Sequence, residues 1–197
     1  MENLKPKFPP SSPDIDSEIE FFQRKELYNF VPESNEFIQA AKKAAISYSQ
    51  TPIFPIGIVA VKDGVIVAEA GNGNGYHERN IDTPGHRKGC VRRHLNDIRE
   101  GQGLVKFKSG AGFELCPGCH TDAHAEANLI KSAVENKVIE KLSGAHVYMY
   151  GHFWCCKPCW DKMITVGINQ VYLPDNADKF KNKEEVEKWV EEVKRQK

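Results

Sequence analysis

Apolar residues recur along the first third of the chain with two spacings, one helical and one extended. Helical spacing of apolar positions from Phe37 to Tyr48 predicts a helix capped at its start by Ser34. Two apolar, β-branched runs, IGIVAV and VIVAEAG, flank the turn sequence Lys-Asp-Gly at residues 62–64. A short polar turn between two such runs predicts a β-hairpin over residues 57–70.

The second half of the chain alternates between helical and extended patterns. Helical spacing predicts helices in HAEANLIKSAVENK, CKPCWDKMITVG and KEEVEKWVEEVKRQK, and short apolar runs predict strands in AHVYMY and INQVYLP. A strand–helix–strand order favours parallel strands with helices on both faces of one sheet. The predicted fold class is therefore α/β, a three-layer α/β/α sandwich with a central mixed sheet.

Two segments depart from this regular pattern. Residues 1–33 begin with a Pro- and Ser-rich stretch, which predicts an N-terminal arm. Residues 71–118 are rich in Gly, Asn, His and Arg and form a long insert with one short predicted helix near residues 90–100. Residues 34–197, with this insert, are expected to form a single domain, because a chain of 197 residues can bury one sizeable core.

Charge and composition bound the class of protein. The chain carries 27 Lys and Arg against 27 Asp and Glu, so its net charge favours neither a nucleic-acid-binding protein nor a membrane-surface protein. It shows no secretory signal, and no run reaches the roughly 18–20 apolar residues of a membrane span. We therefore expect a cytoplasmic protein with no membrane partner, and nucleic acid is not the expected partner.

Six cysteines lie between Cys90 and Cys159, which in a reducing compartment indicates metal ligands or catalytic thiols rather than disulfides. His124 begins one predicted helix, and Cys156 with Cys159 begins the next. These three zinc ligands leave a fourth position for water, as in catalytic zinc sites. Glu126 lies two residues after His124, so its carboxylate can approach the metal-bound water without binding the metal. Its expected role is proton transfer. The alternative is a zinc ribbon that only stabilises the fold.

A second group of thiols lies in the insert. Cys116 and Cys119 form another Cys-x-x-Cys pair, and Cys90 precedes them. With one histidine they can hold a second, structural zinc ion, or they can remain packed free thiols. The candidate histidines are His86, His94 and His120. Cys155 is predicted to be a small buried filler rather than a ligand.

The order His-Ala-Glu followed by Cys-x-x-Cys on the next helix resembles the signature of the zinc-dependent cytidine and deoxycytidylate deaminases. The segments VKDGVIVAEAGN, GCVRR, FELC and GINQVYL are similar to deoxycytidylate deaminases in particular, and the resemblance covers residues 35–175. Cys155 departs from it, since the family usually has proline there. The resemblance implies that zinc activates water, that Glu126 carries protons, and that no organic cofactor is needed.

Candidate substrate contacts come from the resemblance and from local composition. The resemblance places a substrate-binding asparagine at Asn72, after the hairpin. Basic residues concentrate in the insert, where Arg92 and Arg93 are candidates for binding a nucleotide phosphate, and solvated loop charge is the alternative. Four rings are candidates for stacking on a base, with packing in the core as the alternative for the last of them: Trp154, Phe153, His152 and Trp160.

The expected reaction is the hydrolytic deamination of a cytosine nucleotide, with dCMP giving dUMP and ammonia. One alternative is a nucleic-acid deaminase that acts on a flipped or single-stranded cytosine or adenine. Another is a non-catalytic, zinc-stabilised nucleic-acid-binding module, whose affinity would fall steeply with salt. The resemblance also implies a homo-oligomer.

Overall fold

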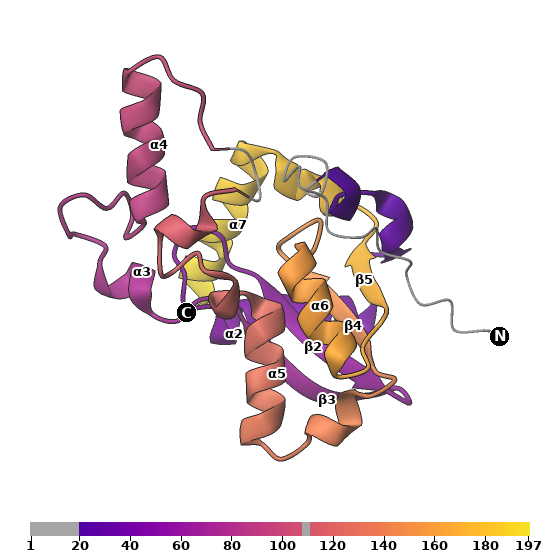
Figure 1. Cartoon of the computed structure of the whole chain (residues 1–197). Coiled ribbons are helices and arrows are strands. Elements are labelled where there is room, and N and C mark those ends of the chain that lie inside the picture. The colour runs from indigo at the N-terminus through magenta and orange to yellow at the C-terminus, as the bar shows by residue number, and fades with distance from the viewer. Residues whose placement is uncertain (1–19, 108–110) are drawn as a thin grey trace.

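A computed structural model describes residues 20–107 and 111–197 of the chain. Figure 1 shows a central sheet with helices packed against it. The sheet has five strands in the order β1-β5-β4-β2-β3. The strands are β1 (Asn29–Val31), β2 (Gly57–Lys62), β3 (Val65–Gly71), β4 (His146–Tyr150) and β5 (Val171–Pro174). The α-helices are α2 (Glu36–Tyr48), α3 (Tyr76–Arg79), α4 (Val91–Gly101), α5 (Ala125–Glu135), α6 (Lys157–Thr165) and α7 (Lys183–Gln196).

The sheet is mixed because it combines a hairpin with a crossover. β2 pairs antiparallel with β3 and with β4, whereas β4 pairs parallel with β5, which α6 connects to it. The predicted hairpin over residues 57–70 is thus formed by β2 and β3. These pairings confirm the α/β class and the mixed sheet.

The central strand β2 enters both cores of the sandwich. Its Ile58 and Ala60 are fully buried in the cluster that includes residues of α5 and α6, and Val59 lies in the cluster formed with α2 and α7. Successive side chains of a strand point to opposite faces of the sheet. The helices therefore form one layer on each face, as the sequence pattern predicts.

The helix α2 begins one residue later than expected. Asn35, and not Ser34, caps it: the Asn35 side-chain oxygen accepts hydrogen bonds from the backbone N–H groups of Phe37 (3.0 Å) and Ile38 (3.3 Å). Serine and asparagine are both preferred helix caps, so the spacing of apolar residues could not decide between Ser34 and Asn35 as the cap.

Part of the predicted N-terminal arm belongs to the sandwich. Within residues 20–33, β1 pairs parallel with the edge of β5, and Phe22 and Tyr28 are buried in the core. The prediction for residues 1–19 lies outside the part of the chain that the structure describes.

The insert of residues 71–118 carries α3 and α4. No residue of α4 is fully buried, although most are partly buried, and this helix stands away from the sandwich in Figure 1. Among the described residues, no helix combines the length and apolar composition needed to cross a membrane.

Candidate active site

Two neighbouring helix N-termini bring together the three predicted zinc ligands. His124 precedes the first residue of α5, Cys156 precedes the first residue of α6, and Cys159 lies in the first turn of α6. The His124 Nδ1 atom lies 3.3 Å from the Cys159 Sγ atom and 3.6 Å from the Cys156 Sγ atom. All three ligand atoms lie within 4.8 Å of one another, so one ion can contact them together.

The donor set of this site fits Zn²⁺. Imidazole and thiolate are preferred zinc ligands, and usual zinc–ligand bond lengths place neighbouring atoms of a tetrahedron about 3.5–3.8 Å apart. Hydrogen bonding from Cys159 lowers the pKa of the Cys156 thiol to about 6, against the effect of burial. A bound zinc ion would hold both Cys156 and Cys159 as thiolates, and the three protein ligands leave one coordination position free.

The orientation of His124 is fixed from the insert. Its Nε2 atom lies 3.2 Å from the backbone oxygen of Cys119, and the Phe113 ring packs edge-on against the imidazole with centroids 5.3 Å apart. A carbonyl can only accept a hydrogen bond, so Nε2 carries the hydrogen and Nδ1 is left for the metal.

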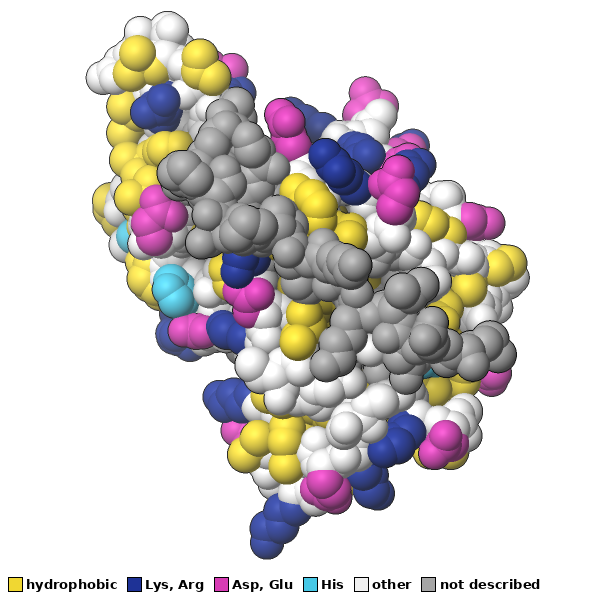
Figure 2. Space-filling view, turned by 45° about the vertical axis from the view of Figure 1, so that its right-hand side comes forward, with side chains coloured by type: hydrophobic (Ala, Val, Ile, Leu, Met, Phe, Trp, Pro, Cys, Tyr) yellow, Lys and Arg dark blue, Asp and Glu magenta, His cyan; other side chains and the backbone are white. Residues whose placement is uncertain are grey.

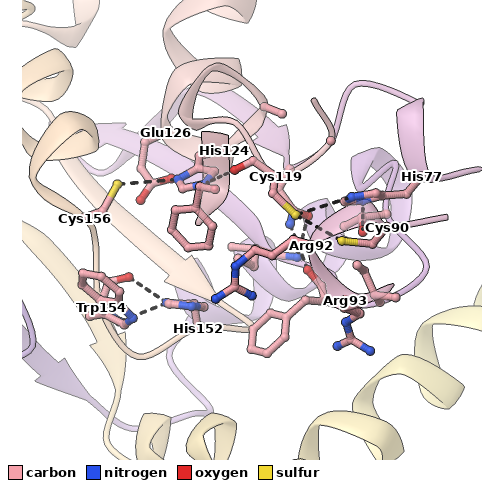
Figure 3. Close-up of a pocket in the computed structure, with 18 of the residues that line it drawn as sticks. His77, Cys90, Arg92, Arg93, Cys119, His124, Glu126, His152, Trp154 and Cys156 are labelled. Atoms are coloured by element: carbon pink, nitrogen blue, oxygen red, sulfur yellow. Dashed lines mark hydrogen bonds between the residues drawn. The ribbon is translucent and has the colours of Figure 1, made fainter. Parts of the chain in front are cut away.

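Glu126 is buried in the first turn of α5, with a side chain that lines the same cavity as His124 and Cys156. Figure 3 shows Glu126 beside these two residues. Cys155 is also fully buried; burial raises the pKa of its thiol well above the usual value, and the Glu126 charge and a hydrogen bond to that carboxylate act in the same direction. Cys155 is therefore a neutral thiol packed against Glu126 and is not one of the three clustered ligands.

A cavity of about 370 Å³ opens in front of Glu126. One wall comes from the sandwich and the other from the insert, so residues far apart in the sequence face the same space (Figure 3). The four predicted substrate contacts all line this cavity. They are Asn72, Arg92, Arg93 and Trp154.

Asn72 is largely committed to holding the adjacent loop. Its Nδ2 atom donates to the Phe54 carbonyl (2.9 Å), and its Oδ1 atom accepts from the Ile56 backbone N–H (2.9 Å) and the Ser49 hydroxyl (2.7 Å). No other side-chain hydrogen bond of Asn72 is formed with the described residues. One Nδ2 hydrogen is therefore what this side chain can offer to a ligand.

The two arginines differ in their surroundings. Arg92 donates from Nε to the Ala111 carbonyl (2.7 Å), and its guanidinium lies 5.3 Å from the centre of the Phe113 ring. The Arg93 side chain makes no hydrogen bond or ion pair with any described residue. Burial lowers the pKa of Arg93, and the positive charges of Arg87 and Arg92 act in the same direction. An anion in the cavity would offset this unfavourable concentration of positive charge.

His152 lines the cavity, and the sequence predicted it only as one of several rings that can stack on a base. Its Nδ1 atom lies 2.8 Å from the Trp154 carbonyl, and its ring stacks on Phe153 with an interplanar angle of 9°. Burial lowers the pKa of His152 to about 4, so the ring is neutral at pH 7. The same Nδ1 atom also lies 3.3 Å from the Trp154 backbone N–H, so the backbone of Trp154 holds this side of the ring in the cavity wall. The aromatic run Gly-His-Phe-Trp was the only local signal.

A second group of four side chains that could hold a metal ion lies in the insert and directly after it. The ligand atoms of His77, Cys90, Cys116 and Cys119 lie within 4.8 Å of one another. The histidine of this group is His77, whereas the sequence analysis expected one of three other histidines as the fourth ligand. The three candidates that lie outside the group are His86, His94 and His120.

The rejected histidines have other surroundings. The His86 Nε2 atom lies 2.9 Å from the Tyr76 hydroxyl, and the His120 Nδ1 atom lies 3.3 Å from the Asp122 carboxylate. His77 stands 39 residues before Cys116 and has no short spacing to any cysteine, so only the folded chain reveals it.

A comparison with curated proteins found no match. The family model described as the cytidine and deoxycytidylate deaminase zinc-binding region matches residues 32–174, which is more than half of the chain. The matched range contains both helix N-termini that carry the zinc ligands, together with Glu126. The site and this match agree, and the chain belongs to the cytidine and deoxycytidylate deaminase family.

Proposed function

We propose that the protein deaminates the cytosine ring of a free nucleotide, converting dCMP to dUMP and ammonia. One observation carries this proposal: the buried Glu126 carboxylate shares a cavity with a three-ligand zinc site and with an arginine whose side chain is unpaired. Zinc chemistry accounts for hydrolysis, and the arginine accounts for a phosphorylated substrate.

Bound zinc supplies Lewis acidity, which makes water nucleophilic near neutral pH. Glu126 accepts a proton from the attacking water and transfers it to N3 of the cytosine ring. The new C–O bond forms at C4, the C4–N bond breaks, and Glu126 assists the protonation of the departing ammonia. Burial of Glu126 keeps bulk water away from these proton transfers.

The cavity has the size and lining of a mononucleotide site. Its volume of about 370 Å³ lies within the usual range of small-molecule pockets. Arg93 supplies an unpaired guanidinium for the phosphate, and Arg92 lies beside it. The aromatic wall at Trp154 suits a planar base, and Asn72 has one amide hydrogen to donate.

The surface gives less support to a nucleic-acid substrate. On the face shown in Figure 2, Lys and Arg side chains are interspersed with Asp and Glu. In the insert, Arg87 pairs with Asp97, and Lys106 pairs with Glu100 at 2.7 Å. Ion pairs of this kind reduce the continuous positive surface that binding to a phosphate backbone needs.

The function is tested by measuring ammonia release from a panel of substrates. The panel contains cytosine, cytidine, deoxycytidine, CMP, dCMP and a single-stranded oligonucleotide. We expect turnover of the monophosphates, dCMP best, because they carry a phosphate for Arg93, which cytosine and the nucleosides lack. Equal turnover of deoxycytidine and dCMP would exclude the phosphate assignment, and turnover of the oligonucleotide alone would support the nucleic-acid alternative.

Three variants accompany this assay. Glu126→Gln should retain zinc but lower kcat at least about 100-fold, the scale of general acid–base catalysis. Arg93→Ala should reduce the preference for dCMP over deoxycytidine by about 10–100-fold, as expected for the loss of a charge-assisted hydrogen bond. Arg87→Ala is the matched control, because this exposed arginine is paired with Asp97 and does not line the cavity.

We also propose that the insert group binds a structural zinc ion. The Cys90 and Cys119 Sγ atoms are 3.5 Å apart, and the His77 Nε2 atom lies 3.4 Å from the Cys116 Sγ atom. These separations are near those of a zinc tetrahedron, and four protein ligands close the coordination shell. The Thr51 hydroxyl contacts His77 Nδ1 at 3.0 Å, which leaves Nε2 for the metal.

The cytoplasmic location and the homo-oligomer stay predictions of the sequence analysis.

A further inference from the structure

We infer that Cys119 connects the two metal centres: its thiol is a ligand of the insert centre, and its backbone carbonyl orients His124 of the active site. The insert centre thereby positions the zinc-binding histidine of the active site. The Cys119 side chain is part of the insert group, whereas its backbone carbonyl accepts the hydrogen bond from His124 Nε2. The inference rests on the proposed zinc-dependent function, and it adds a structural dependence of one centre on the other.

The carbonyl of Cys119 is held in place by a tight turn. The Cys119 backbone N–H donates to the Cys116 carbonyl (2.8 Å), and the His120 N–H donates to the same oxygen (3.1 Å). The turn is closed at both ends by thiols of the insert group. A metal ion that binds the Cys116 and Cys119 thiolates would therefore fix the peptide that faces His124.

The imidazole of His77 packs directly on this turn. Its Nε2 atom lies 3.6 Å from the Cys119 Sγ atom. A Cβ atom at Gly118 would lie 2.5 Å from the same nitrogen, so only glycine leaves room for the ring here. The position of His77 and the position of the Gly118–Cys119 peptide are thus set together.

The insert centre also supports the substrate wall of the cavity. Cys90 directly precedes α4, which carries Arg92 and Arg93, and both Cys90 and Cys119 line the cavity in front of Glu126. Figure 3 shows His77 and Cys90 on one side of Cys119 and His124 on the other. One group of ligands is therefore connected to the catalytic histidine and to the proposed phosphate contacts.

The size of the expected effect follows from the hydrogen bond to His124. A metal-ligating histidine loses about 10–100-fold in metal affinity when the group that orients its second nitrogen is removed. A centre that only stabilised the insert would leave the affinity of the His124 site unchanged. Zinc affinity therefore separates the two interpretations without a measurement of turnover.

The test compares zinc binding to the full chain and to variants by competition with a chromophoric chelator. The wild type should bind two zinc ions, and His124→Ala identifies which affinity belongs to the insert centre. In the double variant His77→Ala/Cys116→Ser the insert centre should be lost, and the His124 site should bind zinc about 10–100-fold more weakly. The matched control is His86→Ala, because His86 lies in the same insert but outside the ligand group.

Two further measurements guard against simple unfolding. The single variant His77→Cys keeps four ligating side chains in the insert group. It should therefore bind two zinc ions, with the wild-type affinity at the His124 site. In the wild type, NMR of labelled histidine should show a slowly exchanging Nε2 proton on His124, and the double variant should lose it while retaining its circular dichroism. One zinc ion per wild-type chain, or unchanged affinity of the His124 site in a folded double variant, would overturn the inference. Absence of ammonia release from every cytosine substrate would instead count against the proposed function alone.

Discussion

Glu33 is a half-buried carboxylate that joins the start of α2 to the C-terminal part of the chain. Its Oε1 atom accepts a hydrogen bond from the Tyr150 hydroxyl (2.7 Å), and its Oε2 atom accepts from Lys179 (2.7 Å) and from Asn176. Burial would raise the pKa of Glu33, but hydrogen bonds from Lys179, Asn176 and Tyr150 outweigh it and lower the pKa to about 2. The charged form of Glu33 is therefore the one that the fold stabilises.

This shift predicts a defined dependence of stability on pH. Because the folded pKa lies below the unfolded value of about 4.3, the stabilisation is complete above that pH and is lost as pH falls toward 2. Glu33→Gln should lower the free energy of unfolding by about 1–2 kcal/mol at pH 7, and the difference from wild type should vanish near pH 2. Urea unfolding between pH 2 and 7 measures this. The exposed Glu187→Gln is the control, and a constant difference across that range would contradict the assignment.

Among the elements, α2 packs unusually closely on the β2–β3 hairpin because two glycines line the contact. A Cβ atom at Gly57 would lie 2.1 Å from the Ala41 carbonyl oxygen, and one at Gly71 would lie 2.3 Å from the Ser49 nitrogen. These contacts are with backbone atoms, which no side-chain rotation can move away. The helix and the strands therefore meet backbone to backbone at one end of the sheet.

Gly57→Ala should consequently destabilise the domain by at least about 2 kcal/mol, since overpacking against a rigid neighbour forces the backbone to shift. Gly101→Ala is the matched substitution, because a Cβ atom there meets nothing within 4 Å and the residue ends a helix. We expect that variant to be neutral or slightly stabilised. Thermal unfolding of both variants checks the comparison, and equal melting temperatures would show that α2 can move away from β2.

The elements that the sequence predicted are those with a repeating apolar pattern. The hairpin, α5, α6 and α7 each carry several apolar residues at the spacing of their own structure, and all were predicted. β1 was missed because it has three residues, only one of them partly buried, and follows a Pro- and Ser-rich stretch. Its place in the sheet depends on pairing with β5, which no local pattern encodes.

At the scale of the whole molecule, the catalytic group was predictable and the insert group only in part. His124 and Glu126 share one turn, and Cys156 and Cys159 share another, so short spacing reveals both pairs. His77 joins its group only when α3 folds against the turn at Cys116. The link from Cys119 to His124 runs through a backbone carbonyl, which has no signature in the sequence.

Tyr28 provides another long-range link, from the N-terminal segment to the metal site. Its hydroxyl donates to the Phe22 carbonyl (2.6 Å) and accepts from the Cys155 backbone N–H (2.8 Å), 127 residues away. Cys155 directly precedes the ligand Cys156, so the Tyr28 hydroxyl supports the loop that leads into α6. Burial raises the pKa of Tyr28 well above its usual value, which keeps the hydroxyl a donor at all working pH values.

Tyr28→Phe removes only this hydroxyl and leaves the ring packed against Trp160. The buried Cys155 N–H would then lose its hydrogen-bond acceptor, which should cost about 1–3 kcal/mol in the free energy of unfolding. The zinc-loaded protein should lose this stability as well, because metal binding does not replace a backbone hydrogen bond. Urea unfolding with and without a chelator measures both values against the control Tyr48→Phe, whose exposed hydroxyl donates to Glu69. If Tyr28→Phe has the same free energy of unfolding as the wild type, the N-terminal segment does not support the metal-binding loop. The stability of that loop then comes from α6 and the sheet alone.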